Sequence, residues 1–169
     1  LDTGHVKLMT SYYPLEKLRK IHGLESAKFV DPYSGGKGNS VRYLSVAPVS
    51  TDLKVKGIDN LFCGGEKSGL FVGHTEAICT GSLAGHNAVR YAYNIPTLVL
   101  PNDTVIGDII SYATYKIKTK EGRKNRYTFA GAEFFNRMKE RGLYSTDRKE
   151  IQNRIASLGL TDIFNKKLV

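Results

Sequence analysis

The chain has 169 residues, of which 41% are apolar and 24% are charged, a mix typical of globular domains. We expect one domain, or one domain with an appendage, because this length buries enough surface to fold without staples. The two cysteines, Cys63 and Cys79, exclude a disulfide scaffold and a zinc site of four thiolates. No apolar run reaches the roughly 18 residues of a membrane span. We therefore expect a cytoplasmic protein with reduced thiols, no metal site and no membrane partner.

The positive charge is concentrated in the last third of the chain. Residues 1–112 carry a net charge of +1, whereas residues 113–169 carry +8. Such asymmetry favours an anionic partner for the basic part, such as nucleic acid, because every phosphate contact releases counterions. A solvated loop without a ligand fits the same composition. The candidate nucleic-acid-binding residues are the cations of the densest run: Lys116, Lys118, Lys120, Arg123, Lys124 and Arg126.

The first sixty residues contain few strong signals. Residues 14–22 read as a short helix, with Pro14 in its first turn and Gly23 after its end. Short strands or edge elements are expected at residues 28–30, 41–46 and 54–58, with a glycine-rich loop at residues 34–40.

A glycine-rich unit in the middle of the chain is more informative. Residues 60–63 read as a buried strand, and residues 66–73 contain too much glycine for a helix. From His74 to Tyr93, small and apolar residues recur at spacings of three and four, which predicts a helix. Glycine costs about 1 kcal/mol relative to alanine inside a helix. Gly81 and Gly85 therefore predict that this helix lies very close to a sheet or another backbone.

The remainder predicts a group of small helices. An extended segment is expected at 97–100, followed by a helix over 105–113 that Asn102 or Asp103 caps. A strand is expected at 126–129, followed by a helix over 130–141 that Gly142 ends. The next helix is capped by Ser145 or Thr146 and ended by Gly159, and a short helix begins at Thr161. The fold class is therefore α/β, with short strands and one long glycine- and alanine-rich helix, followed by a helical region. We place the boundary between residues 1–112 and 113–169, where the charge changes.

A strand, a glycine turn and a helix present backbone N–H groups to an anion, and glycine lets a phosphate or a flat ring approach closely. A tight structural turn without a ligand has the same sequence pattern. The common dinucleotide and phosphate-loop fingerprints are absent from residues 36–41 and 66–68. This chain alone is therefore not expected to hold a whole dinucleotide.

The residues of this unit match a known pattern. The segments Asn60-Leu61-Phe62-Cys63-Gly64-Gly65-Glu66, Gly73-His74-Thr75-Glu76-Ala77 and Gly81-Ser82-Leu83-Ala84-Gly85-His86-Asn87-Ala88 resemble the FAD-binding C-terminal motif of the glucose-inhibited division protein A family. Weaker similarity covers Phe29-Val30-Asp31-Pro32, residues 101–112 and residues 126–134. The chain departs from the family pattern at Glu66, where the family has Gln, at His74, where it has Tyr, and by one extra residue before Gly73.

The resemblance implies a Rossmann-like FAD-binding domain whose C-terminal part completes the flavin site. Carried over residue by residue, the cofactor-binding positions are Gly64, Gly65, Glu66, Gly73, His74 and Thr75. A carboxylate at position 66 accepts hydrogen bonds from sugar hydroxyls but cannot donate as Gln does. His74 either donates a proton to the flavin edge or is a hydrogen-bonded turn residue. No catalytic residue is identified, since the redox chemistry would belong to the cofactor.

The function implied by the resemblance is that of a C-terminal fragment of an FAD-dependent tRNA uridine-modifying enzyme, inactive alone. Its partners would be FAD, tRNA and the N-terminal half of the same protein, and a homodimer is compatible with the resemblance. Two alternatives remain: an FAD-dependent oxidoreductase with another substrate, and a flavin-independent nucleic-acid-binding module.

Cys63 and Cys79 are expected to be buried small hydrophobes rather than redox thiols.

Overall fold

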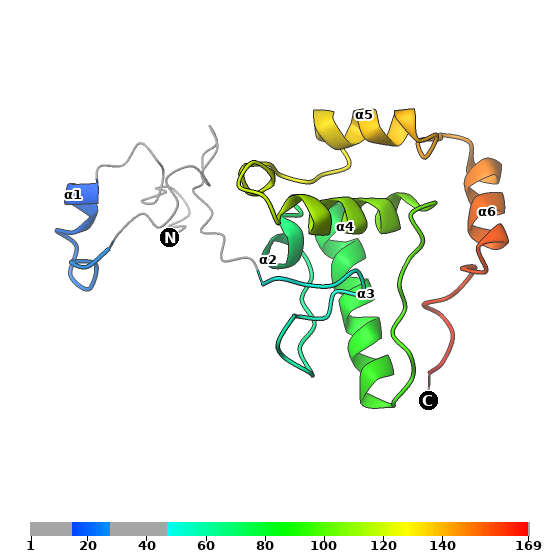
Figure 1. Ribbon diagram of the computed structural model, residues 1–169, viewed down its shortest axis with the longest axis horizontal. Helices are drawn as coiled ribbons and strands as arrows, with labels where there is room; N and C mark the ends of the chain where they lie inside the picture. The colour runs from blue at the N-terminus through cyan, green and yellow to red at the C-terminus, as the bar shows by residue number, and fades with distance from the viewer. Residues whose placement is uncertain (1–14, 28–46, 169) are drawn as a thin grey trace. The chain divides into compact units, whose positions relative to one another are not determined.

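The computed structural model describes residues 15–27 and 47–168, and the chain divides into two compact units, Leu1–Ser45 and Val46–Val169 (Figure 1). The strands expected at 28–30 and 41–46, the loop at 34–40 and the family-like segment at 29–32 lie outside the described residues. In the first unit, helix α1 covers Leu15–Leu18 and buries Leu18. After α1 the chain continues through turns to Gly23, whose φ of +86° lies in the region that favours glycine. The helix predicted over 14–22 is therefore present but shorter than expected.

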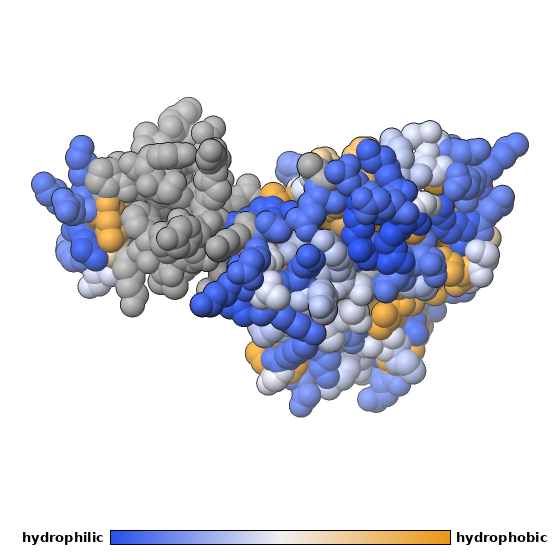
Figure 2. All heavy atoms as spheres, turned by 45° about the horizontal axis from the view of Figure 1, so that its top comes forward, coloured by the Kyte–Doolittle hydropathy of each residue, from blue (hydrophilic) through white to orange (hydrophobic). Residues whose placement is uncertain are grey.

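The core of the second unit forms around two helices, α3 (His74–Ala92) and α4 (Val105–Lys116). The two helices contact each other, and α4 also contacts α2, a single helical turn over Glu66–Gly69 (Figure 1). The most buried side chains are apolar ones from these elements and the segments beside them: Leu53, Leu70, Phe71, Leu83, Ile109, Ile110 and Tyr127. Hydrophilic residues cover most of the visible surface of this unit, and hydrophobic residues gather in small separate patches (Figure 2).

The extended segments of this unit pair through isolated bridges. Val49 pairs with Val55 and Lys54 with Phe62, both antiparallel, and Phe71 pairs with Tyr127 in parallel. No longer strand occurs among residues 47–168. The buried strand predicted at 60–63 is wrong, because Leu61 is 45% exposed and only Phe62 reaches a bridge partner. The α/β class of the domain as a whole stays a prediction.

The glycine content did not prevent a helical turn at residues 66–69. This turn, α2, ends where Leu70 adopts a left-handed conformation with φ of 60°. Its last residue, Gly69, has the ring of Phe71 where a Cβ would lie, only 2.5 Å away. The expectation that 66–73 contains no helix is therefore wrong for its first four residues.

Two of the small helices expected in the last sixty residues are present, α5 (Ala132–Glu140) and α6 (Arg148–Ser157). A short 3-10 helix, η1 (Gly122–Lys124), was not predicted. Gly142 and Gly159 follow α5 and α6 with φ of +63° and +69°, as the sequence predicted. Residues 161–165 form turns instead of the predicted helix. The predicted boundary between residues 112 and 113 falls inside α4 and inside the second compact unit.

Two helix caps differ from the predictions. Thr104 caps α4, because its hydroxyl accepts a hydrogen bond from Gly107 N–H at 2.9 Å, and neither Asn102 nor Asp103 fills that role. Asp147 caps α6 by accepting from the N–H groups of Lys149 and Glu150. In both cases a polar residue stood immediately before the helix, and the sequence reading placed the cap one or two residues too early.

A buried ion pair holds α5 against α4. Asp108 has a fully buried side chain and receives both Nε and Nη2 of Arg137, at 2.8 and 2.7 Å. Arg141 adds a third contact at 3.0 Å. The Asp108 interaction raises the pKa of Arg137, whose guanidinium also lies 4.3 Å from the ring of Tyr112. None of the helices in the described ranges is long and apolar enough to cross a membrane.

Candidate functional site at the start of helix α3

Gly64 lies directly against the backbone of α3. A Cβ at this position would come within 2.7 Å of Gly81 N and 2.9 Å of Gly81 Cα. Only glycine allows this approach without a shift of backbone against backbone. The expectation that the small-residue helix lies very close to another backbone is therefore confirmed at Gly64 and Gly81.

Gly65 is also fixed from within the unit. It is buried, its N–H donates to Thr80 Oγ1 at 2.8 Å, and its carbonyl accepts from the hydroxyl of Ser68 at 2.9 Å. Its φ of +71° lies in the region that favours glycine. The next residue, Glu66, is half-buried at the first position of α2. The backbone of Gly64 and Gly65, two of the predicted cofactor residues, thus serves the packing of α2 on α3.

Gly73 sets the entry to α3. Its φ is +136°, and a Cβ there would lie within 2.1 Å of Glu76 Oε2, so a side chain at this position would displace that carboxylate. Glu76 is buried, and its Oε1 accepts a hydrogen bond from Phe129 N–H at 2.6 Å. This contact fixes residues 127–130 to the start of α3. The carboxylate of the motif therefore has a structural partner 53 residues away.

The first turn of α3 is open to solvent. His74 and Thr75 are exposed, and Gly73 makes no side-chain cap. The N–H groups of His74, Thr75 and Glu76 have no acceptor among the described residues. Free amides at the start of a 19-residue helix carry a partial positive charge that favours an anion. Of the six predicted cofactor residues, Gly73, His74 and Thr75 lie here, whereas Gly64 and Gly65 lie inside the fold.

Asn87, another residue of the family-like motif, is a buried hydrogen-bonding centre. Its Nδ2 donates to the carbonyls of Asp52 and Leu98, at 2.9 and 2.8 Å, and its Oδ1 accepts from Leu98 N–H at 2.7 Å. The Asp52 carboxylate in turn accepts from Thr97 Oγ1. Asn87 therefore joins α3 to two segments that carry no secondary structure of their own.

One face of α3 is small, apolar and uncovered among the described residues. Ala77, Gly81, Gly85 and Ala88 are exposed, and a Cβ at Gly81 or Gly85 would meet nothing within 4 Å. Ile78, beside this face, is 68% exposed. We call these five residues the open face of α3. The close approach at Gly81 depends on the missing Cβ of Gly64, so the packing reason expected for the missing side chains of Gly81 and Gly85 is not present in the described part of the chain.

The predicted nucleic-acid-binding residues follow one another around the end of α4. Lys118, Lys120 and Arg123 are exposed, and the ammonium of Lys118 lies 5.8 Å from the ring of Tyr115, which is 68% exposed. Lys116 and Arg126 are half-buried, and the side chain of Lys124 lies outside the described part of the structure. Gly122 keeps the turn tight, since a Cβ there would overlap the carbonyl oxygen of Lys116. We call residues 115–126 the basic turn.

The two thiols are less buried than the sequence led us to expect. Cys63 and Cys79 are both half-buried, and burial raises the pKa of each thiol. A raised pKa leaves less thiolate, which is the nucleophilic form. Sequence reasoning assigned no role to Thr80, Asn87 or Asp108. It expected the small-residue face of the helix to be the packed one, whereas Thr80 and Asn87 lie on the buried side and most of the small-residue face is exposed.

Comparison with known proteins gives the family. The model of the family "Glucose inhibited division protein A" matches residues 2–96, more than half of the chain. Relatives include the methylenetetrahydrofolate–tRNA-(uracil-5-)-methyltransferase TrmFO of Enterococcus faecalis, 32% identical over 84% of this chain and 30% of the relative, and that of Bacillus licheniformis, 29% identical over 89% and 32%. The tRNA uridine 5-carboxymethylaminomethyl modification enzyme MnmG of Desulfotalea psychrophila is 31% identical over 59% of this chain and 16% of its own.

The matched regions span only about a sixth to a third of the length of these relatives. No solved structure matches the chain. The family match includes the glycine segment and helix α3, and the resemblance found in the sequence is therefore confirmed: the chain belongs to the glucose-inhibited division protein A family.

Proposed function

We propose that the chain is the C-terminal part of an FAD-dependent tRNA uridine-modifying enzyme, in which it completes the flavin site and offers a basic surface to tRNA. The observation that carries the proposal is the family match across the glycine segment, joined to the exposed first turn of α3. The names of the relatives are those of tRNA uridine and uracil modification enzymes. The chain alone is expected to bind FAD weakly and to catalyse nothing.

The first turn of α3 is the part of the chain that would meet the flavin. Gly73 leaves the backbone bare, and the amides of His74 and Thr75 are free to donate. Glu66 lies at the start of α2, where its carboxylate would accept hydrogen bonds from ribityl hydroxyls. Gly64 and Gly65 would act indirectly, by positioning rather than by touching the flavin, since their contacts with Thr80 and Gly81 fix the position of α2 on α3.

The open face of α3 supports the proposal that the N-terminal half of the same protein covers this chain. Each glycine inside a helix costs about 1 kcal/mol relative to alanine, and nothing described here recovers that cost at Gly85. A second backbone packed on Ala77, Gly81, Gly85 and Ala88 would recover it through close contact. A flavin held between the two parts would touch the adjoining first turn of α3.

A titration of the isotope-labelled chain with FAD tests the flavin contact. We expect amide resonances of Gly73, His74 and Thr75 to shift in a saturable manner, while those of the basic turn stay fixed. The variant Thr75→Pro removes one donor amide at a position where helices tolerate proline. It should weaken the shifts, whereas Thr97→Ala, outside the first turn of α3, should not. Shifts spread evenly over the chain, or none at all, would count against the flavin contact.

The basic turn supports the proposed contact with tRNA. Its exposed cations and the exposed ring of Tyr115 combine charge with a stacking surface. Retention of tRNA by the chain over a salt series should weaken steeply as salt rises, because counterion release drives the binding. The double variant Lys118→Gln/Lys120→Gln should flatten the salt slope by about two units, and Lys166→Gln/Lys167→Gln provides a control of equal charge. Retention that does not depend on salt would contradict the proposal.

The same basic turn favours the second candidate, a nucleic-acid-binding module that needs no flavin. The two candidates separate in one comparison, since the second predicts salt-dependent tRNA retention together with no FAD-induced shifts at the start of α3. A third candidate, an FAD-dependent oxidoreductase with another substrate, predicts the FAD-induced shifts without tRNA retention.

A further inference from the structure

A largely apolar cavity of about 390 Å³ lies between the start of α4, helix α5 and helix α6, and none of its described lining residues belongs to α3. Its walls include the rings of Phe129, Phe135 and Tyr144 and the branched side chains of Ile106 and Ile155. Small-molecule sites have this size and this composition, with a few polar groups that fix the ligand. The cavity plays no part in the function proposed above.

Among the described residues that line this cavity, Arg154 is the one that carries a charge. Its guanidinium donates to the carbonyls of Leu143 and Gly142, at 2.9 and 2.8 Å, and to the Glu150 carboxylate at 2.9 Å. Nε and one Nη1 hydrogen have no acceptor among the described residues. The side chain is only 22% exposed, so water covers little of it. A partly buried cation with spare donors favours an anionic acceptor.

Two hydroxyls of the lining are already used. The Thr104 hydroxyl donates to Pro101 O and accepts from Gly107 N–H. The Ser145 hydroxyl donates to Glu150 and accepts from Asp147 N–H. Among the described lining residues, the side-chain donors left for an anion are therefore those of Arg154 and the hydroxyl of Tyr144, and the other lining side chains are rings and aliphatic groups.

The walls of the cavity are held in place by contacts of their own. Asp108 and Arg137 tie α5 to α4, and Arg154 ties α6 to the chain that leaves α5. The rings of Phe135 and Tyr144 meet edge to face at 5.1 Å. The cavity is thus formed before any ligand arrives, which limits the entropy that binding must overcome.

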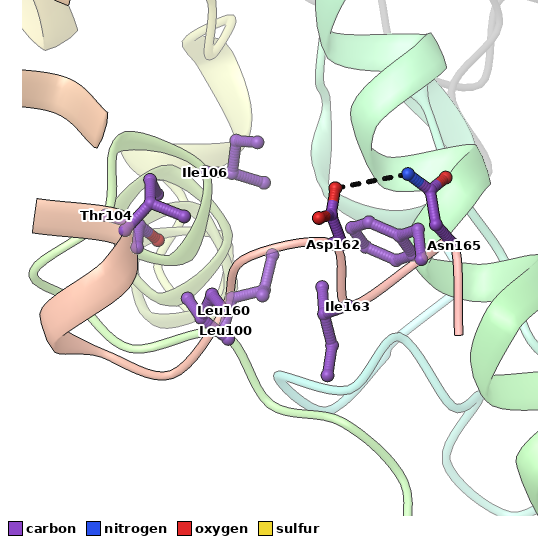
Figure 3. A pocket seen from close by; sticks show the side chains of 9 residues that line it. Leu100, Thr104, Ile106, Leu160, Asp162, Ile163 and Asn165 are labelled. Atoms are coloured by element: carbon purple, nitrogen blue, oxygen red, sulfur yellow. Dashed lines mark hydrogen bonds between the residues drawn. The ribbon is translucent and has the colours of Figure 1, made fainter. Parts of the chain in front are cut away.

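An adjoining cavity of about 310 Å³ shares Thr104, Ile106 and Ile155 with the first (Figure 3). One of its walls is the turn segment of Leu160 to Asn165, where the Asp162 carboxylate accepts from Asn165. Within the described part of the chain, residues 161–166 hydrogen-bond only with residues 160–166, and the ring of Phe164 meets that of His86 at 5.1 Å. This wall is less firmly held, and the cavity offers no spare charged donor, so we assign it no ligand.

We propose that the cavity between α4, α5 and α6 binds a small planar aromatic acid, whose ring lies among Phe129, Phe135 and Tyr144 and whose carboxylate accepts hydrogen bonds from Arg154. The volume suits one or two fused rings. The carboxylate would accept from Nε and Nη1, the donors that Arg154 keeps beside its ion pair with Glu150, and the ring meets the aromatic edges of the lining.

A matched pair of probes tests both halves of the proposal. Indole-3-carboxylate and indole-3-carboxamide share a ring and differ in charge. We expect the acid to bind the full chain with a dissociation constant below about 1 mM, and the amide at least about tenfold more weakly. Methyl resonances of Met138, Ile106 and Ile155 should shift in the titration. Equal binding of the two probes would overturn the role of Arg154.

Two variants place the binding in this cavity. Ile151 is 42% exposed at the rim, so Ile151→Trp should fill the cavity from outside, leave the melting temperature nearly unchanged and abolish binding of the acid. Ile58→Trp, at a position that is 46% exposed and lies outside the cavity, is the matched control and should bind normally. In Arg154→Lys, which keeps the charge but not the planar donors, the preference for the acid should fall at least about threefold. Normal binding by Ile151→Trp would overturn the proposal.

Discussion

The buried carboxylate of Glu76 accepts a hydrogen bond from the main-chain N–H of Phe129 at 2.6 Å, across 53 residues of sequence. Glu76 belongs to the first turn of α3, and Phe129 follows the segment whose Tyr127 pairs with Phe71. The contact and the bridge together fix the start of α3 relative to the segment that follows the basic turn. Glu76 is thus a positioning residue for the proposed flavin contact rather than part of it.

Replacing this carboxylate should destabilise the chain. Glu76→Ala leaves Phe129 N–H without its partner, and we expect the free energy of unfolding to fall by about 1–3 kcal/mol. Glu76→Gln keeps an acceptor oxygen and should cost less. Urea unfolding measures both, with the exposed Asp103→Ala as a control. A loss in Glu76→Ala no larger than in the control would show that the hydrogen bond contributes nothing.

Asn87 should be still more sensitive. Its side chain is fully buried and makes three hydrogen bonds, so Asn87→Ala leaves one N–H and two carbonyls unpaired. We expect a loss of about 3 kcal/mol in the free energy of unfolding. Asn87→Asp keeps the acceptor for Leu98 N–H but places an oxygen against two carbonyls, and it should be no more stable than the alanine variant. Asn136→Ala, at an exposed position of α5, should change stability little.

The sequence predicted the helices well, because their signals are local. The small-residue period from His74 and the glycines after α5 and α6 depend only on neighbouring residues. The strand at 60–63 was wrong because an apolar run does not say what covers it, and Leu61 faces solvent. The pairings of Glu76 with Phe129 and of Asp108 with Arg137 join residues 53 and 29 positions apart. No local pattern encodes such distances.

The predicted site shows the same limit. The motif identified Gly64 to Thr75 as special, but the sequence could not separate residues that pack the motif from residues that face solvent. Gly65 and Gly73 both need a positive φ, and only the structure shows the first engaged with Thr80 and the second at the entry to an open helix.

Alkaline pH should destabilise the fold through Tyr127. Its hydroxyl donates to Gly122 O at 2.9 Å, and burial, with Glu133 and Tyr112 nearby, raises its pKa well above the ordinary 10.0. The unfolded chain therefore loses this proton first. The contribution of the Tyr127 hydroxyl to the free energy of unfolding is fully present below about pH 10 and falls as the pH rises above that value.

The variant Tyr127→Phe isolates this effect. It should lose about 1 kcal/mol at neutral pH with the hydrogen bond, but its stability should fall less steeply between about pH 9 and pH 11. Urea unfolding over that range measures the slope, and Tyr115→Phe, at an exposed ring, is the control. Parallel slopes for Tyr127→Phe and the parent chain would contradict the assignment.

The contact between Gly64 and Gly81 predicts opposite outcomes for the same substitution at its two ends. A Cβ on Gly64 would lie 2.7 Å from Gly81 N, and both atoms belong to packed backbone that must shift. Gly64→Ala should therefore lower the free energy of unfolding by about 1–3 kcal/mol.

A Cβ on Gly81 points into open space, so Gly81→Ala should stabilise this chain by about 1 kcal/mol through helix propensity. Gly85→Ala should behave like Gly81→Ala. In the proposed complex with an N-terminal half, however, a polypeptide packed on the open face of α3 would meet the new methyl groups, so Gly81→Ala and Gly85→Ala should there destabilise and reduce retention of the proposed flavin. A gain in stability in both settings would mean that nothing packs on this face.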